Sequence, residues 1–185
     1  MAMSSTAVTR AALFSAVCIA LNVSLNKLAV LLQLPVFMDT VGTVLSGALV
    51  PPPFSIAVGV ISNLIGGVIT HPAIPFFSGT QVVVSLMSIF GFRRGWFDRA
   101  WSAVLWGLAI GIVSAIVSAP ITVLMFGGVT EPGATAINAM LIAAGKDIWT
   151  AVLSGTIIVS SIDKVIAALV TMLVLKRMPD RLKQT

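Results

Sequence analysis

Long apolar segments separated by short polar connections most constrain what this chain can fold into. Six segments can be marked among the 185 residues: about 11–32, 39–50, 54–69, 76–92, 101–126 and 148–175. They are apolar all round rather than alternating, so helices are expected and barrel strands are not. Only 9% of the residues are charged, against about 25% in a soluble domain. With a mean hydropathy of +1.09, the sequence predicts one all-α membrane domain over 1–185, a compact bundle of six transmembrane helices.

The positions of the basic residues predict the orientation of these helices. Eight of the 11 Lys and Arg residues fall near the termini or in the connection after the fourth segment: Arg10, Arg93, Arg94, Arg99, Lys176, Arg177, Arg181 and Lys183. Six crossings place all of these on one side, and basic connections mark the cytoplasmic side. We therefore expect a multi-pass protein of the cell membrane with both termini cytoplasmic. The first segment is expected to be a retained helix rather than a signal peptide.

The sequence carries no enzyme signature. There is no metalloprotease motif, nucleophile elbow or P-loop. The single histidine, His71, makes a metal site a poor interpretation, and the single cysteine, Cys18, cannot form an intrachain disulfide. The net charge of +5 comes from clusters between apolar runs rather than from one soluble face, which argues against nucleic acid as a partner. We expect no enzyme activity, no cofactor and no metal.

Polar side chains within apolar segments are costly, so they usually face the protein interior or a cavity. Amides offer both donors and acceptors, which suits a heterocyclic ligand, and tryptophan can stack on a ring. The candidate substrate-binding residues are Asn26, Asn63, Gln81, Lys146, Trp149 and Ser160, with Asp39, His71 and Asp163 as secondary candidates. Purely structural roles stay open: helix packing for Asn63, an ordinary helix start for Gln81, an interfacial cap for His71, and an ion pair with Lys164 for Asp163.

The stretch "MDTVGTVLSGALVPPP" forms the short second segment. Asp39 at its start is expected to cap the free N–H groups of that helix, with direct ligand contact as the second possibility. About 12 helical residues cover only about 18 Å of a roughly 30 Å hydrocarbon core. We therefore expect neighbouring helices to shield this segment, or the preceding loop to extend it. The three prolines are expected to turn the chain after it.

Two further features could take part in binding: a ridge of alanines in the first segment and a long connection after the fifth. Ala12, Ala16 and Ala20 lie at positions i, i+4 and i+8 of the first segment, a ridge of small residues that lets another helix approach closely. The approaching helix could belong to this chain or to a partner. The connection "GGVTEPGATAINAMLIAAGKD" is long, so it is either a binding loop or a partly helical surface loop.

Taken together, the run "MDTVGTVLSGALVPPPFSIAVGVISNLIGGVI", the alanine ridge, "RRGWFDR" and the ending "KRMPDRL" resemble the S components of energy-coupling factor (ECF) transporters. The resemblance covers nearly the whole chain. It implies a micronutrient-binding subunit whose alanine ridge docks on a membrane coupling subunit that two cytosolic ATPases drive. It also implies a cavity between the fourth, fifth and sixth segments, closed by the first, third and fifth connections.

The substrate itself stays open in the sequence. Pyridoxine-like, pyrimidine-precursor, flavin and deazapurine compounds are all compatible with stacking plus amide contacts. The alternative function is a stand-alone membrane sensor, because a similar "MDTxGT…NL" pattern occurs in sensor regions of histidine kinases. The sequence ends shortly after its last apolar segment, which favours the transporter interpretation.

Overall fold

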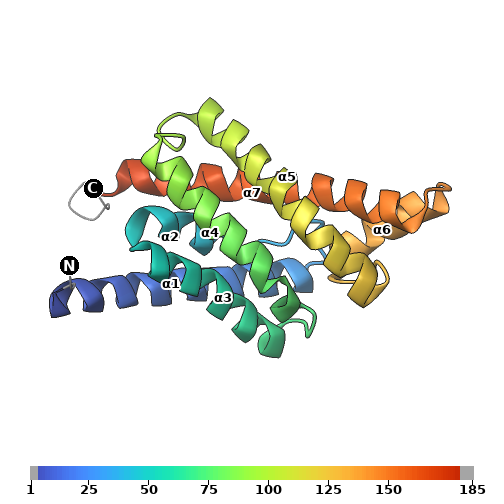
Figure 1. Ribbon diagram of the computed structural model, residues 1–185, viewed down its shortest axis with the longest axis horizontal. Helices are drawn as coiled ribbons and strands as arrows, with labels where there is room; N and C mark the ends of the chain where they lie inside the picture. Colours follow the sequence, from blue (N-terminus) through green and yellow to red (C-terminus); the bar gives the residue numbers. More distant parts are fainter. Residues whose placement is uncertain (1–3, 180–185) are drawn as a thin grey trace.

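The computed structural model describes residues 4–179, which form helices and no strands. The elements are α1 (Ser5–Leu31), α2 (Val41–Leu49), α3 (Pro52–Ile69), η1 (Ile74–Phe77), α4 (Ser78–Arg93), α5 (Ala100–Phe126), α6 (Pro132–Ala143) and α7 (Ile148–Arg177). Each of the six predicted segments coincides with one α-helix (Figure 1). The prediction of an all-α fold is therefore confirmed for the described residues.

Five stretches of the described chain are long and apolar enough to cross a membrane: α1, α3, η1 with α4, α5 and α7. The sixth predicted segment, α2, has only nine residues, about 14 Å of helix. All nine are buried, because α1, α3, α4 and α7 pack around this helix. Shielding by neighbours, expected from the shortness of the segment, is what the structure shows.

The helix ends follow local sequence signals. Ser4 accepts a hydrogen bond from the Ala7 backbone N–H at 3.3 Å, so α1 begins six residues before the predicted start. Pro51 precedes α3 and Pro52 occupies its first position, where a missing N–H costs nothing. Asp147 caps α7 by accepting from two backbone N–H groups at 3.0 and 3.1 Å.

The long connection after α5 contains a helix of its own. The 12-residue α6 packs against α7, and Figure 1 shows it at the end of the molecule away from the termini. Of the two interpretations of this connection, the partly helical one describes its structure. Glu131, directly before α6, also reaches the cavity described below.

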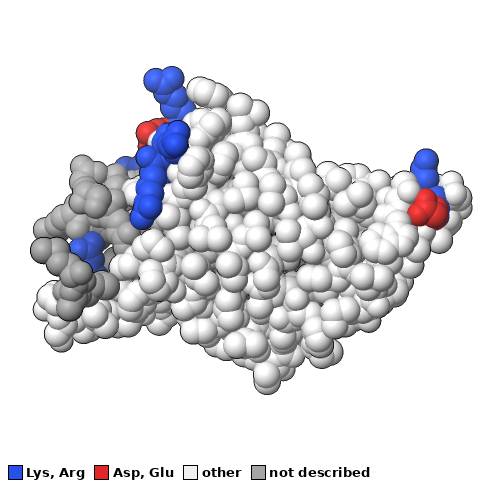
Figure 2. All heavy atoms as spheres, in the orientation of Figure 1, with Lys and Arg blue, Asp and Glu red and all other residues white. Residues whose placement is uncertain are grey.

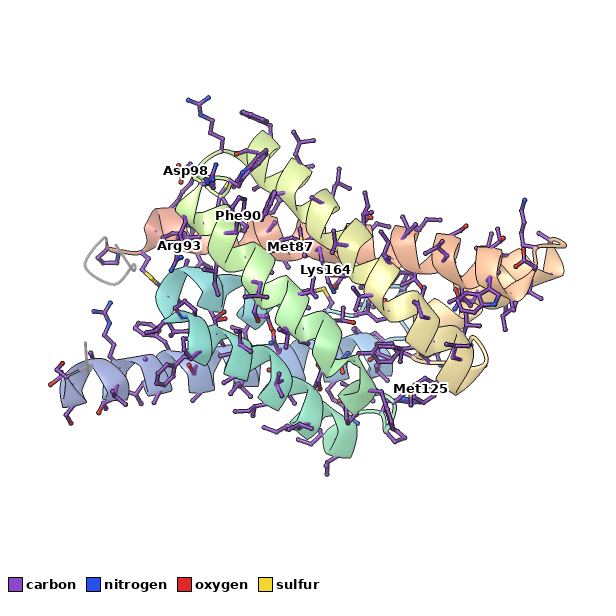
Figure 3. All side chains as sticks on the ribbon, viewed as in Figure 1. Met87, Phe90, Arg93, Asp98, Met125 and Lys164 are labelled. Atoms are coloured by element: carbon purple, nitrogen blue, oxygen red, sulfur yellow. The ribbon has the colours of Figure 1, made fainter. Side chains whose placement is uncertain are left out.

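The start of α1 and the end of α7 lie at the same end of the molecule (Figure 1). Lys and Arg side chains gather at that end in Figure 2, and Figure 3 places Arg93 and Asp98 there, with Lys164 in the interior. Arg181 and Lys183 lie outside the described residues. The charge segregation that the sequence predicted is thus present along the long axis.

Candidate binding site

A cavity lies where α3, α4, α5 and α7 meet the connections that precede α2, α4 and α6. The free space inside it and at its open mouth is about 660 Å³. Its lining residues are Phe37, Asp39, Thr40, Asn63, Ala73, Ile74, Phe77, Thr80, Gln81, Ser114, Ser118, Thr122, Thr130, Glu131, Ala134, Thr156, Ser160 and Lys164. The first, third and fifth connections all contribute to this wall.

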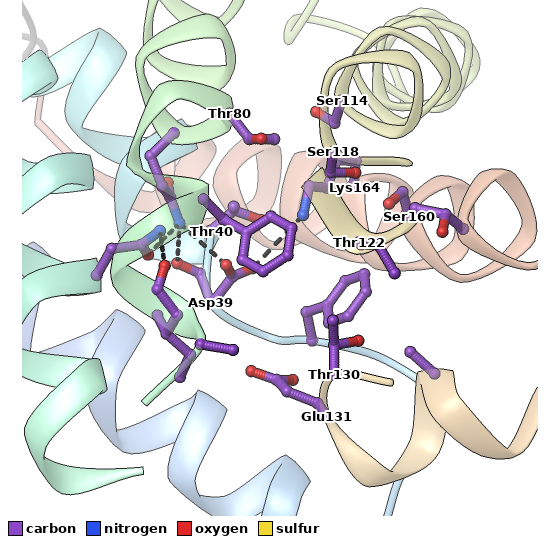
Figure 4. Close-up of a pocket in the computed structure, with 18 residues that line it drawn as sticks. Asp39, Thr40, Thr80, Ser114, Ser118, Thr122, Thr130, Glu131, Ser160 and Lys164 are labelled. Carbon is purple, nitrogen blue, oxygen red and sulfur yellow. Dashed lines mark hydrogen bonds and ion pairs between the residues drawn. The ribbon is translucent and has the colours of Figure 1, made fainter. Parts of the chain in front are cut away.

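Two stripes of polar residues form one side of the cavity (Figure 4). Each recurs every fourth residue, so each keeps one helix face: Ser114, Ser118 and Thr122 on α5, and Thr156, Ser160 and Lys164 on α7. The two helices pack closely at Gly111. A Cβ there would lie 2.6 Å from Ser161 Cα and 2.8 Å from the Ser160 carbonyl oxygen. Glycine at this position therefore allows the hydroxyl stripes of the two helices to face one cavity.

Lys164 is the centre of a buried ion cluster. Its Nζ lies 2.6 Å from Asp163 Oδ2 and 3.5 Å from Asp39 Oδ1. Asp163 also accepts from the Met38 backbone N–H at 2.6 Å and from Thr40 Oγ1 at 3.3 Å. The cluster thereby fixes the connection before α2 against α7.

Asp39 does not cap α2. The helix begins at Val41 after Thr40, and no side chain caps it. The Asp39 carboxylate instead pairs with Lys164 and accepts from Gln81 Nε2 at 3.0 Å. The capping prediction was wrong because the packing of α7 and α4 brings a cation and an amide to the Asp39 carboxylate, which accepts from them instead.

A chain of amide and hydroxyl hydrogen bonds holds Gln81 in the cavity wall. Asn22 Nδ2 donates to Thr43 Oγ1 at 2.8 Å, and Thr43 Oγ1 donates to Gln81 Oε1 at 2.9 Å. Gln81 Nε2 in turn donates to Asn63 Oδ1 at 3.1 Å, and Asn63 Nδ2 donates to the Ile74 carbonyl at 3.1 Å. These bonds connect α1, α2, α3 and α4, so the amides serve both helix packing and the cavity surface.

Glu131 approaches the cavity from the connection before α6. Its Oε1 accepts from Asn26 Nδ2 at 3.0 Å, a contact between residues 105 positions apart. Burial, with a smaller contribution from the charge of Asp39, raises the pKa of Glu131 to about 8. The carboxyl group is therefore largely protonated in the ligand-free protein at neutral pH.

This shift predicts a pH-dependent stability. The pKa of Glu131 in the folded protein lies above the ordinary value of about 4.3. Its contribution to the free energy of unfolding is therefore complete below that value and is lost as the pH rises through about 8. We expect the Tm of the purified protein to fall between about pH 4.3 and about pH 8 and to level off above that. The variant Glu131→Gln keeps an acceptor for Asn26 and should show a smaller fall, although Asp39, Asp163 and Lys164 still face the position. Equal slopes for the two proteins would contradict the assignment.

Three buried polar atoms around the cavity have no hydrogen-bond partner within the described protein: Ser114 Oγ, Thr80 Oγ1 and Asn26 Oδ1. Ser114 is only 1% exposed and lines the main cavity. Asn26 is 3% exposed and lines a smaller adjoining cavity, which shares Asp39 and Asn63 with the main one. Unpaired buried polar groups are costly, so these atoms call for water or a ligand.

The structure brings some of the sequence-predicted residues together. Asn63, Gln81, Ser160 and Asp39 line the main cavity, and Asn26 lines the smaller one. Asp163 lies behind the wall and pairs with Lys164, which is the ion-pair role that the sequence left open for it.

Three other candidates lie outside this lining. Trp149 is 47% exposed at the start of α7, and Lys146 is exposed in the turn before it. The His71 ring accepts a hydrogen bond from the Ala73 backbone N–H at 3.3 Å, which fixes the turn after α3. The stacking role predicted for Trp149 has closer candidates in Phe37 and Phe77, which do line the cavity.

Sequence reasoning missed several cavity residues. The hydroxyl stripe of α5 could have been found, because Ser114, Ser118 and Thr122 repeat every four residues in an otherwise apolar helix. Glu131 gave a weaker signal, as the single glutamate of the chain in its longest connection. Lys164 was identified only as a partner for Asp163.

Comparison of the chain with protein-family models, with curated proteins and with solved structures gave no match. The fold and the cavity together define an all-helical protein with five helices long and apolar enough to span a membrane, and with a polar binding cavity among them.

Proposed function

We propose that this protein is the substrate-binding S component of an ECF transporter, which captures a micronutrient in the cavity for ATP-driven uptake. The observation that carries the proposal is a polar cavity inside an apolar helical bundle, with the hydroxyl of Ser114 buried and unpaired in its wall. Such a cavity, with apolar walls and a few placed polar groups, suits capture without covalent chemistry.

The alanine ridge of α1 supports docking to a partner. Ala12, Ala16 and Ala20 are all exposed, so no helix of the described chain covers them. Packing within the same chain, the other interpretation of the ridge, does not apply to these positions. In the proposed complex the ridge contacts the membrane coupling subunit, and the two ATPases act from the cytoplasmic side, where both termini lie.

Co-purification tests the proposal. A tagged chain expressed in its native membrane should carry with it a membrane coupling subunit and a pair of ATPases, and depletion of the ATPases should abolish uptake of the compound that mass spectrometry finds bound. Recovery of a signalling protein instead, with uptake unaffected, would favour the sensor function.

The substitution Ala16→Leu tests the docking surface. Overpacking a close helix interface costs about 1–3 kcal/mol, which corresponds to about 5- to 150-fold weaker association with the coupling subunit. Ligand binding should be retained, because Ala16 lies on the exposed face of α1. Ala143→Leu makes the same change at an exposed position of α6 and should leave the complex intact. Equal complex yields for both variants would rule out the ridge as the interface.

A further inference from the structure

One end of the cavity has an excess of hydrogen-bond acceptors. Asp39 and Glu131 both present carboxyl groups there, on the side of the connections that precede α2 and α6 (Figure 4). Asn26 adds its Oδ1, which has no donor. The orientation of this amide is fixed, because its Nδ2 donates to two acceptors, the Phe37 carbonyl at 2.9 Å and Glu131 Oε1 at 3.0 Å. When Asp39 and Glu131 are ionised, the unused hydrogen-bonding capacity at this end of the cavity belongs to acceptors.

Lys164 does not supply the matching donors. It is the single basic side chain in the lining of either cavity, and its Nζ is held at 2.6 Å by Asp163 and at 3.5 Å by Asp39. One ammonium group compensates one of these two carboxylates. With Asp39 and Asp163 ionised the cluster carries one net negative charge before Glu131 is counted, and Glu131 adds a second when it ionises.

We propose that the ligand is an organic cation whose protonated amine or amidinium group binds between Asp39 and Glu131. This inference rests on the proposed binding function and specifies its substrate class. The charged group supplies a donor to Asn26 Oδ1, which has none, and adds N–H donors to two carboxyl groups whose oxygens can each accept more than one hydrogen bond. Charge-assisted hydrogen bonds of this kind are the strong ones. No three His, Cys, Asp or Glu side chains of residues 4–179 come close enough to hold a metal ion.

The rest of the cavity fits the body of such a molecule. Phe37 and Phe77 offer faces for a planar part. The hydroxyl stripes of α5 and α7, including the unpaired Ser114 Oγ, can donate to or accept from its polar substituents. An anionic ligand would meet the carboxylates without a free cation to receive it.

Ligand binding should also change the protonation of Glu131. Its pKa of about 8 arises from burial and from the charge of Asp39, and Asp163 and Lys164 on α7 and Asn26 on α1 also face it. A bound cation favours the ionised carboxylate and lowers this pKa. Binding at neutral pH should therefore release a proton into the buffer.

The test uses the full chain in lipid nanodiscs and three sets of probes matched in size. They are benzylammonium, benzyl alcohol and benzoate; butylammonium, butanol and butyrate; and benzamidinium with benzamide. We expect the cationic member of at least one set to raise the Tm, and its neutral and anionic partners to have no effect. Stabilisation by a neutral or anionic member, or by no member of any set, overturns the proposal.

Two variants locate the effect. Glu131→Gln, a neutral isostere that should fold, is expected to weaken the apparent affinity for the stabilising cation by about tenfold or more. Asp147→Asn removes a carboxylate outside the cavity lining but keeps a good helix cap, and should bind as the parent does. Unchanged affinity in Glu131→Gln would also refute the site. Co-purification of the coupling subunit with a neutral or anionic bound compound would refute the cation but not the transport function.

Discussion

Replacing Lys164 by methionine is expected to destabilise the protein by about 3–5 kcal/mol. The Lys164 side chain is 3% exposed and its ammonium group pairs with Asp163 and Asp39. Methionine fills much of the same space but leaves the buried Asp163 carboxylate and the partly buried Asp39 carboxylate without a cation. The free energy of unfolding, measured in detergent micelles by titration with a denaturing detergent, reports the loss.

A matched control and a second-site change sharpen this prediction. Lys146→Met removes one positive charge from an exposed turn and should change stability by no more than about 0.5 kcal/mol. The double variant Lys164→Met with Asp163→Asn should recover part of the loss, because one unpaired carboxylate is gone while the new amide oxygen can still accept from Met38. A Lys164→Met protein as stable as the Lys146→Met protein would show that the ion cluster does not hold α2 to α7.

The substitution Gly42→Ala is expected to cost about 2–4 kcal/mol and to impair ligand binding. A Cβ at Gly42 would overlap the Cys18 carbonyl oxygen and lie 2.9 Å from Asn22 Oδ1. Because backbone cannot move aside cheaply, α1 and α2 must separate, which adds an overpacking cost of about 1–3 kcal/mol. The 2.6 Å hydrogen bond from the Gly42 N–H to Asn22 is then lost, at about 1 kcal/mol.

The expected effect on binding follows from the hydrogen-bond chain. Asn22 holds Thr43, and Thr43 holds Gln81 in the cavity wall, so displacing Asn22 loosens a lining residue. Gly79→Ala is the control, because a Cβ there meets nothing within 4 Å, and it should not lower the stability. A Gly42→Ala protein that unfolds and binds as the Gly79→Ala protein does would contradict close packing between α1 and α2.

Much of the helical plan could be predicted from the sequence. The apolar runs gave the six helices that match α1 to α5 and α7, and the prolines after α2 marked the turn before α3. The helix α6 was not predicted as an element of its own. It has only 12 residues, and the residues on either side of it resemble a loop. These features can be predicted because the residues that start and stop a helix lie within a few turns of its ends in the sequence.

The cavity was predicted less completely, for a different reason. Asn63, Gln81 and Ser160 were found because an amide or hydroxyl inside an apolar run stands out. Trp149 shares a helical stripe with Ser160, but it lies beyond the end of the cavity lining and is exposed. Glu131 could not be placed, because nothing near it in the sequence indicates its contact with Asn26 on α1.

Asp39 shows which properties the sequence determined and which depended on the tertiary structure. The sequence alone determined that this carboxylate stands at the start of a short apolar segment, and that the chain around it is made of apolar helices, since few charged residues are available to cover a surface facing water. Only the tertiary structure decided that its partners are Lys164 and Gln81 rather than the N-terminus of α2. The physical reason is that a buried polar group must be satisfied by whichever donor the packing of distant helices brings within about 3 Å, and hydrophobic periodicity carries no information about that choice.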